Sequence, residues 1–123
     1  MINWCIINGE KKTGLTAHFI DEGVDTGPII KQVEIKIDSS DYISDILIKL
    51  YPVYTKLSKE IIKNFTKLNL LVKPQKKSFM DPYPRRKPED GKIDWKLNEN
   101  KIINLIRAVS KPYPGAFFFP WWL

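Results

Sequence analysis

The residues best suited to chemistry lie in one short stretch of the chain, where acidic side chains are interrupted by glycine. Asp21, Glu22 and Asp25 place three carboxylates within five positions, and Gly23 and Gly27 bracket the last of them. Carboxylates this close repel one another, so one of them is expected to keep its proton to higher pH and to serve as a general acid or base. Glycine has no side chain and lets the backbone approach a flat ligand closely.

The same loop also fits a purely structural role. The Asp25 carboxylate can accept a hydrogen bond from the Gly27 amide in an Asx-turn, as is common in solvated hairpin loops. Because carboxylates with strongly perturbed pKa values are the minority, the residue types alone favour this turn over a catalytic site.

Positive charge is concentrated in the second part of the chain. The 20 Lys and Arg residues exceed the 14 Asp and Glu residues, which gives a net charge of +6. Residues 1–70 carry nine side chains of each sign, whereas residues 71–123 carry eleven basic and five acidic side chains. A surface that attracts anions is therefore expected in the second part.

Two adjacent arginines, Arg85 and Arg86, are the candidates for binding an anion. They belong to a long proline-rich loop expected over residues 72–91, and loops of this length are often functional. Guanidinium groups present paired donors that match phosphate oxygens. An alternative interpretation pairs the arginines with Glu89 and Asp90 in a solvated connection, and the sequence favours neither.

Composition excludes several functional classes. The single cysteine, Cys5, rules out an internal disulfide framework and cannot form a zinc site by itself. No apolar stretch approaches the roughly 18–20 residues that a membrane span needs, and no signal peptide is recognisable. We therefore expect a cytoplasmic protein that binds no metal.

Two predicted strands frame the acidic loop. Residues 15–20 are β-prone, and residues 29–37 carry apolar side chains with charged ones between them, as a half-buried strand does. A long amphipathic helix is predicted next, capped by residues 40–41, kinked at Pro52 and ending near Leu68. Its expected apolar face comprises Ile43, Ile46, Leu47, Leu50, Tyr54, Leu57, Ile61, Phe65 and Leu68.

The remaining predicted elements are shorter. Residues 2–8 form an apolar run too short for its periodicity to separate a helix from a strand. Residues 93–95 are predicted as a short strand, and residues 98–110 as a second helix capped by Asn98. That helix is expected to bury Ile102, Ile103, Leu105, Ile106 and Val109.

The acidic loop and the strand before it resemble a motif of the enzymes that use N10-formyltetrahydrofolate as formyl donor. In that family a strand of the form Gly-x-Thr-x-His-Phe leads into an acidic loop that ends Asp-x-Gly. The matching residues here are Gly14, Thr16, His18, Phe19, Asp25 and Gly27. Further blocks resemble the family in the same order, so that the resemblance covers nearly the whole chain: residues 4–10, 85–95, 106–108 and 112–117.

The resemblance implies an α/β fold, the C-terminal part of a Rossmann-like formyltransferase domain. A few strands are expected to pack with the long kinked helix and the second, shorter helix. Residues 1–123 would form a single, partial catalytic domain. We expect a fragment, because both ends of the chain are apolar and the sequence starts at the family's Trp-x-Ile block.

The implied reaction is formyl transfer from N10-formyltetrahydrofolate to a primary amine. In the family an Asn and a His stabilise the oxyanion that forms when the amine attacks, and an Asp holds the histidine and manages the protons of the amine. Asp25 aligns with that carboxylate. The loop that aligns with the backbone gripping the pterin consists of Asp21, Glu22, Gly23, Val24 and Asp25, with Val24 in an apolar wall.

The Asn and His of the family lie upstream of the Trp-x-Ile block and are not found in this sequence. His18 is a different histidine, for which we favour the interpretation of a satisfied side chain on a strand. The isolated chain is expected to show little or no turnover, because losing even one oxyanion donor costs about 10²–10³ in rate.

A nucleotide-linked amino sugar is the acceptor that the resemblance implies. Residues 85–91 resemble the branch of the family that acts on such sugars, and Arg85 and Arg86 suit a diphosphate. A fragment of a methionyl-tRNA formyltransferase is one alternative. A non-catalytic basic module that binds nucleic acid is another, although regularly spaced stacking aromatics are lacking.

Overall fold

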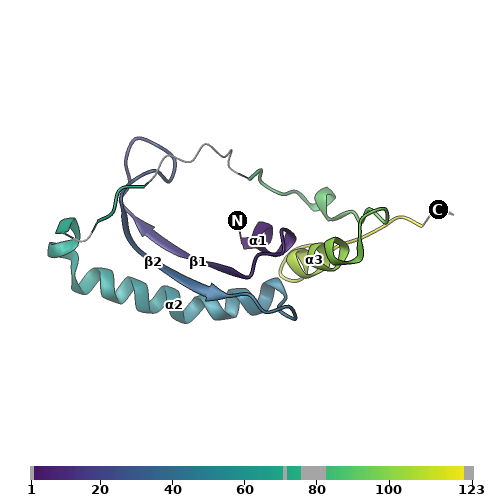
Figure 1. Cartoon of the computed structure of the whole chain (residues 1–123), viewed down its shortest axis with the longest axis horizontal. Helices are drawn as coiled ribbons and strands as arrows, with labels where there is room; N and C mark the ends of the chain where they lie inside the picture. Colours follow the sequence, from purple (N-terminus) through teal and green to yellow (C-terminus); the bar gives the residue numbers. More distant parts are fainter. Residues whose placement is uncertain (1, 71, 76–82, 121–123) are drawn as a thin grey trace. The chain divides into compact units, whose positions relative to one another are not determined.

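The computed structural model describes residues 2–70, 72–75 and 83–120. In chain order its elements are α1 (Ile2–Ile7), β1 (Lys12–His18), β2 (Ile29–Lys36), α2 (Ile43–Lys63), the 3-10 helices η1 (Phe65–Leu70) and η2 (Pro88–Gly91), and α3 (Glu99–Val109) (Figure 1). In the described part of the chain, β1 and β2 form a two-stranded sheet. The predicted α/β class is confirmed.

The chain divides into two compact units, each of which is described by itself. Among the described residues, the first unit comprises 2–13, 36–47 and 83–120, and the second comprises 14–35, 48–70 and 72–75. The acidic loop therefore belongs to the second unit, and the paired arginines belong to the first.

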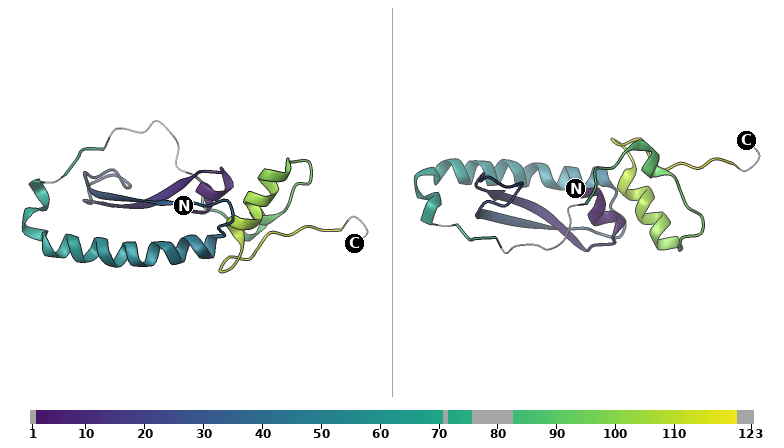
Figure 2. Two further views of the ribbon diagram at one scale, coloured as in Figure 1. Left: turned by 60° about the horizontal axis from the view of Figure 1, so that its bottom comes forward. Right: turned by 90° about the horizontal axis from the view of Figure 1, so that it is seen from above.

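The first unit has an apolar core in which α1 packs against α3 (Figure 2). The Asn3 side-chain amide donates to the Ala108 carbonyl oxygen at 2.7 Å and ties the two helices together. The apolar run at the start of the chain is thus a helix, and the side chain of Ile6 is fully buried. The buried apolar residues of this unit are Ile6, Ile37, Ile43, Ile46, Ile93, Ala108 and Val109.

A buried arginine connects α3 to the segment that precedes α2. Arg107 is 8% exposed and its Nη1 donates to the carbonyl oxygens of Asp38, Ser39 and Asp41 at 3.1, 2.8 and 2.9 Å. Buried guanidinium groups are costly unless their donors are paired. These bonds therefore fix the backbone that leads into α2.

The second unit contains the hairpin loop and most of α2. The loop is closed where the Phe19 amide donates to the Pro28 carbonyl oxygen at 3.0 Å. An antiparallel bridge between Ile29 and Lys73 places the segment of residues 72–75 beside the start of β2. On the α2 side, Leu50 and Leu57 are buried.

The strand predictions are partly corrected. The strand predicted over residues 29–37 is confirmed by β2. The strand predicted over residues 15–20 begins earlier and ends at His18, and Ile20, outside it, is 94% exposed. Residues 93–95 do not form a strand. The neighbouring Lys92 pairs with Phe117 in an isolated bridge, which no second pair among the described residues extends into a ladder.

The long helix is shorter than predicted. α2 runs through Pro52 and ends at Lys63, after which the chain tightens into η1; a kink at Pro52 stays a prediction. Tyr54 and Phe65, predicted as buried, are 58% and 71% exposed. Phe65 lies past the end of the helix, where the apolar periodicity continues, whereas Tyr54 lies within the helix and is left mostly uncovered. The periodicity therefore overestimated the buried face.

The second helix is confirmed, with a different buried face. Asn98 caps α3 by accepting from the Lys101 amide at 2.9 Å, as predicted. Ile103 and Ile106 are 42% and 37% exposed because the face that carries Ala108 is the one packed on α1. No helix among the described residues combines the length and apolarity needed to cross a membrane.

Candidate functional site

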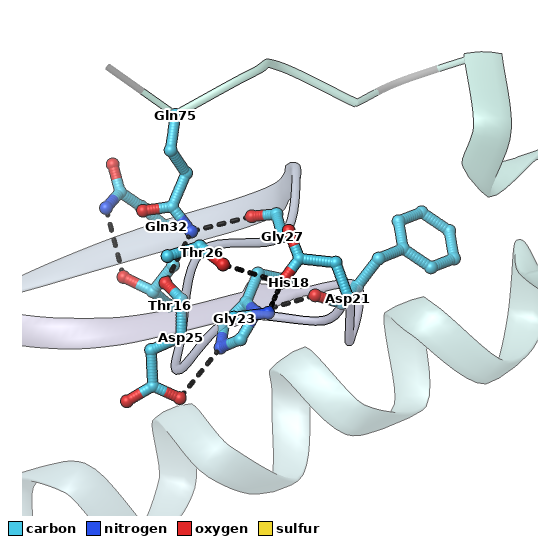
Figure 3. Close-up of polar contacts among 10 residues, drawn as sticks. Thr16, His18, Asp21, Gly23, Asp25, Thr26, Gly27, Gln32 and Gln75 are labelled. Carbon is cyan, nitrogen blue, oxygen red and sulfur yellow. Dashed lines mark hydrogen bonds and ion pairs between the residues drawn. The ribbon is translucent and has the colours of Figure 1, made fainter. Parts of the chain in front are cut away.

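The acidic loop is an exposed turn organised by its first aspartate. Asp21 Oδ1 accepts from the Gly23 amide at 3.1 Å and from the Thr26 hydroxyl at 2.6 Å (Figure 3). This is the Asx-type turn that the sequence suggested for Asp25. The structure assigns it to Asp21 instead, which leaves the Asp25 carboxylate out of the turn.

The same bonds determine the protonation of Asp21. The Thr26 hydroxyl lowers the pKa of Asp21, and the Gly23 amide and the nearby His18 act in the same direction, against a smaller opposing effect of burial. A carboxylate that accepts hydrogen bonds is stabilised in its charged form. The pKa of Asp21 is therefore lowered, and not raised as repulsion among the carboxylates predicted for one of them.

Asp25 has the backbone conformation that distinguishes it from the rest of the loop. Its φ is +55°, in the left-handed region that few residues other than glycine adopt. Its side chain is 87% exposed, and Oδ1 lies 3.5 Å from His18 Nε2 (Figure 3). Uncommon backbone geometry of this kind persists where neighbouring groups enforce it.

Gln75 contacts this part of the loop from outside it. Its Nε2 donates to the Asp25 carbonyl oxygen at 2.9 Å and to the Gly27 carbonyl oxygen at 2.6 Å (Figure 3). A single side chain thus holds the backbone on both sides of Thr26. This role was not predictable from the sequence, because Gln75 lies 50 positions from Asp25.

The glycines of the loop serve its own closure. A side chain on Gly27 would place Cβ 1.7 Å from the Phe19 carbonyl oxygen, and one on Gly23 would place it 2.1 Å from Thr26 Oγ1. The exposed apolar side chains of Ile20 and Val24, at 94% and 90%, lie on the same loop as the carboxylates. The loop therefore offers an open surface with both apolar and polar parts.

The first unit contains a separate cavity of about 510 Å³ with aromatic and basic walls. Three segments contribute to it: the start of α1, residues 83–91 and the turn after α3. The lining residues that bear on binding are Trp4, Tyr83, Arg85, Arg86, Lys87 and Tyr113.

One wall of this cavity is a stack of three side chains. The rings of Trp4 and Tyr83 lie 5.1 Å apart with an interplanar angle of 19°, and the Arg86 guanidinium lies 5.0 Å from the centre of the Trp4 ring. Arg86 also donates to the Asp90 carbonyl oxygen at 2.5 Å, whereas the Asp90 carboxylate accepts from the Lys87 amide at 2.6 Å. Arg86 is thus engaged in building the wall, while the neighbouring Arg85 is exposed.

The predicted site residues fall into two groups, one in each unit. Asp21, Glu22, Gly23, Val24 and Asp25 lie together in the acidic loop, and Arg85 and Arg86 both line the cavity. Trp4 and Tyr83 were missed, although the matching of Trp4 to a family block marked its position. Within the described residues, no group of three or more His, Cys, Asp or Glu side chains could hold a metal ion.

Comparison with known proteins identifies the family. Residues 1–62 match the formyl transferase family, and residues 85–120 match the formyl transferase C-terminal domain. The chain belongs to the formyl transferase family, as its motifs indicated.

Its relatives include two curated proteins. It is 42% identical over 118 residues to the methionyl-tRNA formyltransferase of Thermodesulfovibrio yellowstonii, and 39% identical over 122 residues to the bifunctional polymyxin resistance protein ArnA of Wigglesworthia glossinidia brevipalpis. Each match covers 96% of this chain, but only 38% and 18% of the respective relative. The chain therefore spans much less than the whole length of either relative.

A solved structure gives the same result for the fold. The sugar 3N-formyl transferase WlaRD, crystallised in the presence of dTDP and 5-N-formyl-THF, is 31% identical with a TM-score of 0.72. The match covers 92% of this chain and 42% of that one. The likeness to this structure supports the Rossmann-like formyltransferase fold predicted from the sequence.

Proposed function

We propose that this chain serves formyl transfer from N10-formyltetrahydrofolate to a primary amine, as part of one catalytic domain in which Asp25 is the reacting carboxylate. The observation that carries the proposal is the presentation of Asp25. Its backbone adopts φ +55°, its carbonyl oxygen accepts a hydrogen bond from Gln75, and its carboxylate is 87% exposed beside His18. A group held in this way is available to a substrate and fixed in direction.

The surface around Asp25 fits the folate donor. Ile20 and Val24 present apolar side chains to solvent, and the loop backbone supplies polar groups between them. A pterin ring has an apolar face and a polar edge. The face can cover these apolar side chains, and the edge can form hydrogen bonds with the polar groups of the loop backbone. Asp21, Glu22 and Gly23 belong to this proposed donor surface as the residues that shape the turn.

We assign the acceptor to the class of nucleotide-linked amino sugars. The stacked Trp4 and Tyr83 rings offer an aromatic wall for a base, and Arg85 offers paired donors for a diphosphate. The related WlaRD is a sugar 3N-formyl transferase crystallised with dTDP, which supports the same class.

The roles of the residues follow from their chemistry. The donor supplies the formyl carbon, which the amine nitrogen attacks only in its unprotonated form. The Asp25 carboxylate accepts the proton that the amine releases, and general base catalysis of this kind contributes about 10²–10⁴ in rate. Arg85 binds phosphate, and Arg86 holds the aromatic wall in place.

Grafting tests the proposal in a whole enzyme. The segment of WlaRD that matches this chain is replaced by residues 1–123, and formyl transfer to a dTDP-linked 3-amino sugar is measured with N10-formyltetrahydrofolate. We expect transfer, and we expect it to be abolished by Asp25→Asn with binding of 5-N-formyl-THF retained. A graft that folds and binds 5-N-formyl-THF but keeps its rate after Asp25→Asn would overturn the role of Asp25.

The identity to a methionyl-tRNA formyltransferase supports a second candidate acceptor. The same graft is therefore made in the Thermodesulfovibrio yellowstonii enzyme and tested with methionyl-tRNA. Activity of this graft, together with an inactive but folded WlaRD graft, would favour methionyl-tRNA over the amino sugar.

A further inference from the structure

His18 and Asp25 make a contact that is favourable only with an added proton. His18 Nδ1 lies 2.8 Å from the Phe19 carbonyl oxygen, and its Nε2 lies 3.5 Å from Asp25 Oδ1 (Figure 3). A carbonyl oxygen only accepts hydrogen bonds, so Nδ1 carries a hydrogen. In a neutral imidazole Nε2 then has only a lone pair, which an ionised carboxylate repels.

The two side chains differ in their access to solvent. The His18 side chain is 21% exposed and the Asp25 side chain is 87% exposed, so the carboxylate is the more accessible of the two to a substrate. Two carboxyl groups interact with the ring: Asp25 lies against Nε2, and a charge on His18 contributes to the lowered pKa of Asp21. Both neighbours are carboxylates, which attract a protonated ring.

We propose that His18 is the proton partner of Asp25, a positioning residue whose Nε2 takes up the proton that Asp25 removes from the amine. This inference rests on the proposed function of Asp25. Once the proton is at Nε2, an imidazolium faces a carboxylate, and the 3.5 Å contact becomes attractive. Asp25 is then anionic again, as it was before the proton arrived.

The proton balance of formyl transfer suits such a pair. The amine nitrogen forms a bond to the formyl carbon and loses one proton. The bond between that carbon and N10 breaks, its electron pair goes to N10, and N10 gains one proton. The pair of His18 and Asp25 holds that single proton between the two events, so no net proton is gained or lost.

The first test uses the chain as it exists, because its single histidine gives one set of imidazole signals. By ¹⁵N NMR we expect the neutral ring to carry its hydrogen at Nδ1. In the protonated ring, Asp25→Asn should shift the Nε2–H signal and leave Nδ1–H in place, whereas Asp21→Asn should leave the Nε2–H signal close to its original position. A neutral ring with its hydrogen at Nε2, or an Nε2–H signal that ignores Asp25→Asn, would overturn the proposal.

The second test uses the active WlaRD graft. His18→Gln retains an amide that can hydrogen-bond to Asp25 but cannot take up a proton. We expect kcat to fall about tenfold, less than the roughly 10²–10⁴ of a lost general base, because Asp25 still accepts the proton of the amine but cannot pass it on. In an Asp25→Asn background the same change should have no further effect, because His18 acts through Asp25.

The outcomes separate the two proposals. Full activity of the His18→Gln graft would mean that a hydrogen bond to Asp25 is enough for catalysis. This result would overturn the proposal that His18 takes up the proton. Additive effects of the two substitutions also overturn it. If both grafts fold and both are inactive without any substitution, the proposed function is contradicted, and the NMR measurement on the chain then decides whether the proton-sharing pair exists.

Discussion

The acidic loop and the cavity of the first unit are built in opposite ways. In the loop, His18, Asp21 and Asp25 are close in sequence. One tight turn is organised by Asp21, and Gln75 adds two long-range hydrogen bonds to the backbone at Asp25 and Gly27. The cavity instead brings Trp4 beside Tyr83 and Pro84, with 80 positions between Trp4 and Pro84. The difference teaches that a reacting group can be placed mainly by a local turn with one long-range contact added, whereas a binding wall of this kind depends throughout on how the unit packs.

Substituting the reacting carboxylate gives the largest expected effect. In the WlaRD graft, Asp25→Asn should lower kcat by about 10²–10⁴, the usual contribution of a general base. Affinity for dTDP, measured by calorimetry, should stay the same because the cavity does not include Asp25.

The matched control for this change is Glu99→Gln, at the start of α3. It also converts a carboxylate to an amide, but outside the loop and the cavity. The comparison fails if Asp25→Asn weakens dTDP binding as strongly as it lowers kcat.

The cavity should respond in the opposite way. Arg85→Gln should weaken dTDP binding about tenfold, the size of one lost hydrogen bond to a charged group, with kcat at saturating sugar nearly unchanged. Lys101→Gln removes the same charge from an exposed position on α3 and should leave the affinity unchanged. Equal losses in the two variants would mean that overall charge, and not Arg85 itself, attracts the nucleotide.

The sequence predicted what depends on neighbours along the chain. The hairpin, the Asn98 cap of α3 and the position of the acidic loop all follow from short-range patterns, and all are found. The family motif also indicated Asp25, although its backbone conformation was not predictable from residue types. Within the loop, the choice between Asp21 and Asp25 as turn former depended on the Thr26 hydroxyl.

Contacts between residues far apart in the sequence could not be predicted from short-range patterns. Nothing in residues 72–75 distinguishes Gln75 as the side chain that holds the Asp25 and Gly27 carbonyl oxygens. The buried face of α3 was misjudged for the same reason, because Arg107 is buried by bonds to carbonyls far away in sequence. Periodicity describes which side chains are apolar, but the packing partner decides which of them are covered.

Gln75 offers a way to weaken the loop without changing its sequence. Gln75→Met keeps the length of the side chain but removes both hydrogen bonds to the loop, each of which contributes about 0.5–1.5 kcal/mol. Amide hydrogen exchange of residues 23–27 should become several-fold faster, and kcat of the graft should fall by less than in Asp25→Asn.

Gln32→Met is the matched control for Gln75→Met. Gln32 donates to the Thr16 hydroxyl at 3.0 Å on the strands, away from the loop backbone. If both variants speed exchange in the loop equally, Gln75 has no special role in holding Asp25.

The smallest expected effect concerns the pKa of Asp21. Because the Thr26 hydroxyl lowers this pKa in the folded chain, the turn is fully stabilised above the ordinary value of 3.8 and loses that support as the pH falls through the lower, folded value. Thr26→Val removes the hydroxyl and keeps the branched shape, so the pKa of Asp21 should rise toward its ordinary value. A ¹³C NMR titration of the Asp21 carboxyl measures the change.

Thr16→Val is the control for this titration, since Thr16 bonds to Gln32 and not to Asp21. It should leave the Asp21 titration where it is. If Thr26→Val also leaves the pKa of Asp21 unchanged, the hydroxyl is not what lowers this pKa. The Gly23 amide and His18 would then be the groups that keep the Asp21 carboxyl ionised. In that case the acidic loop would depend on the same histidine that we propose as the partner of Asp25, and His18→Gln should then raise the pKa of Asp21.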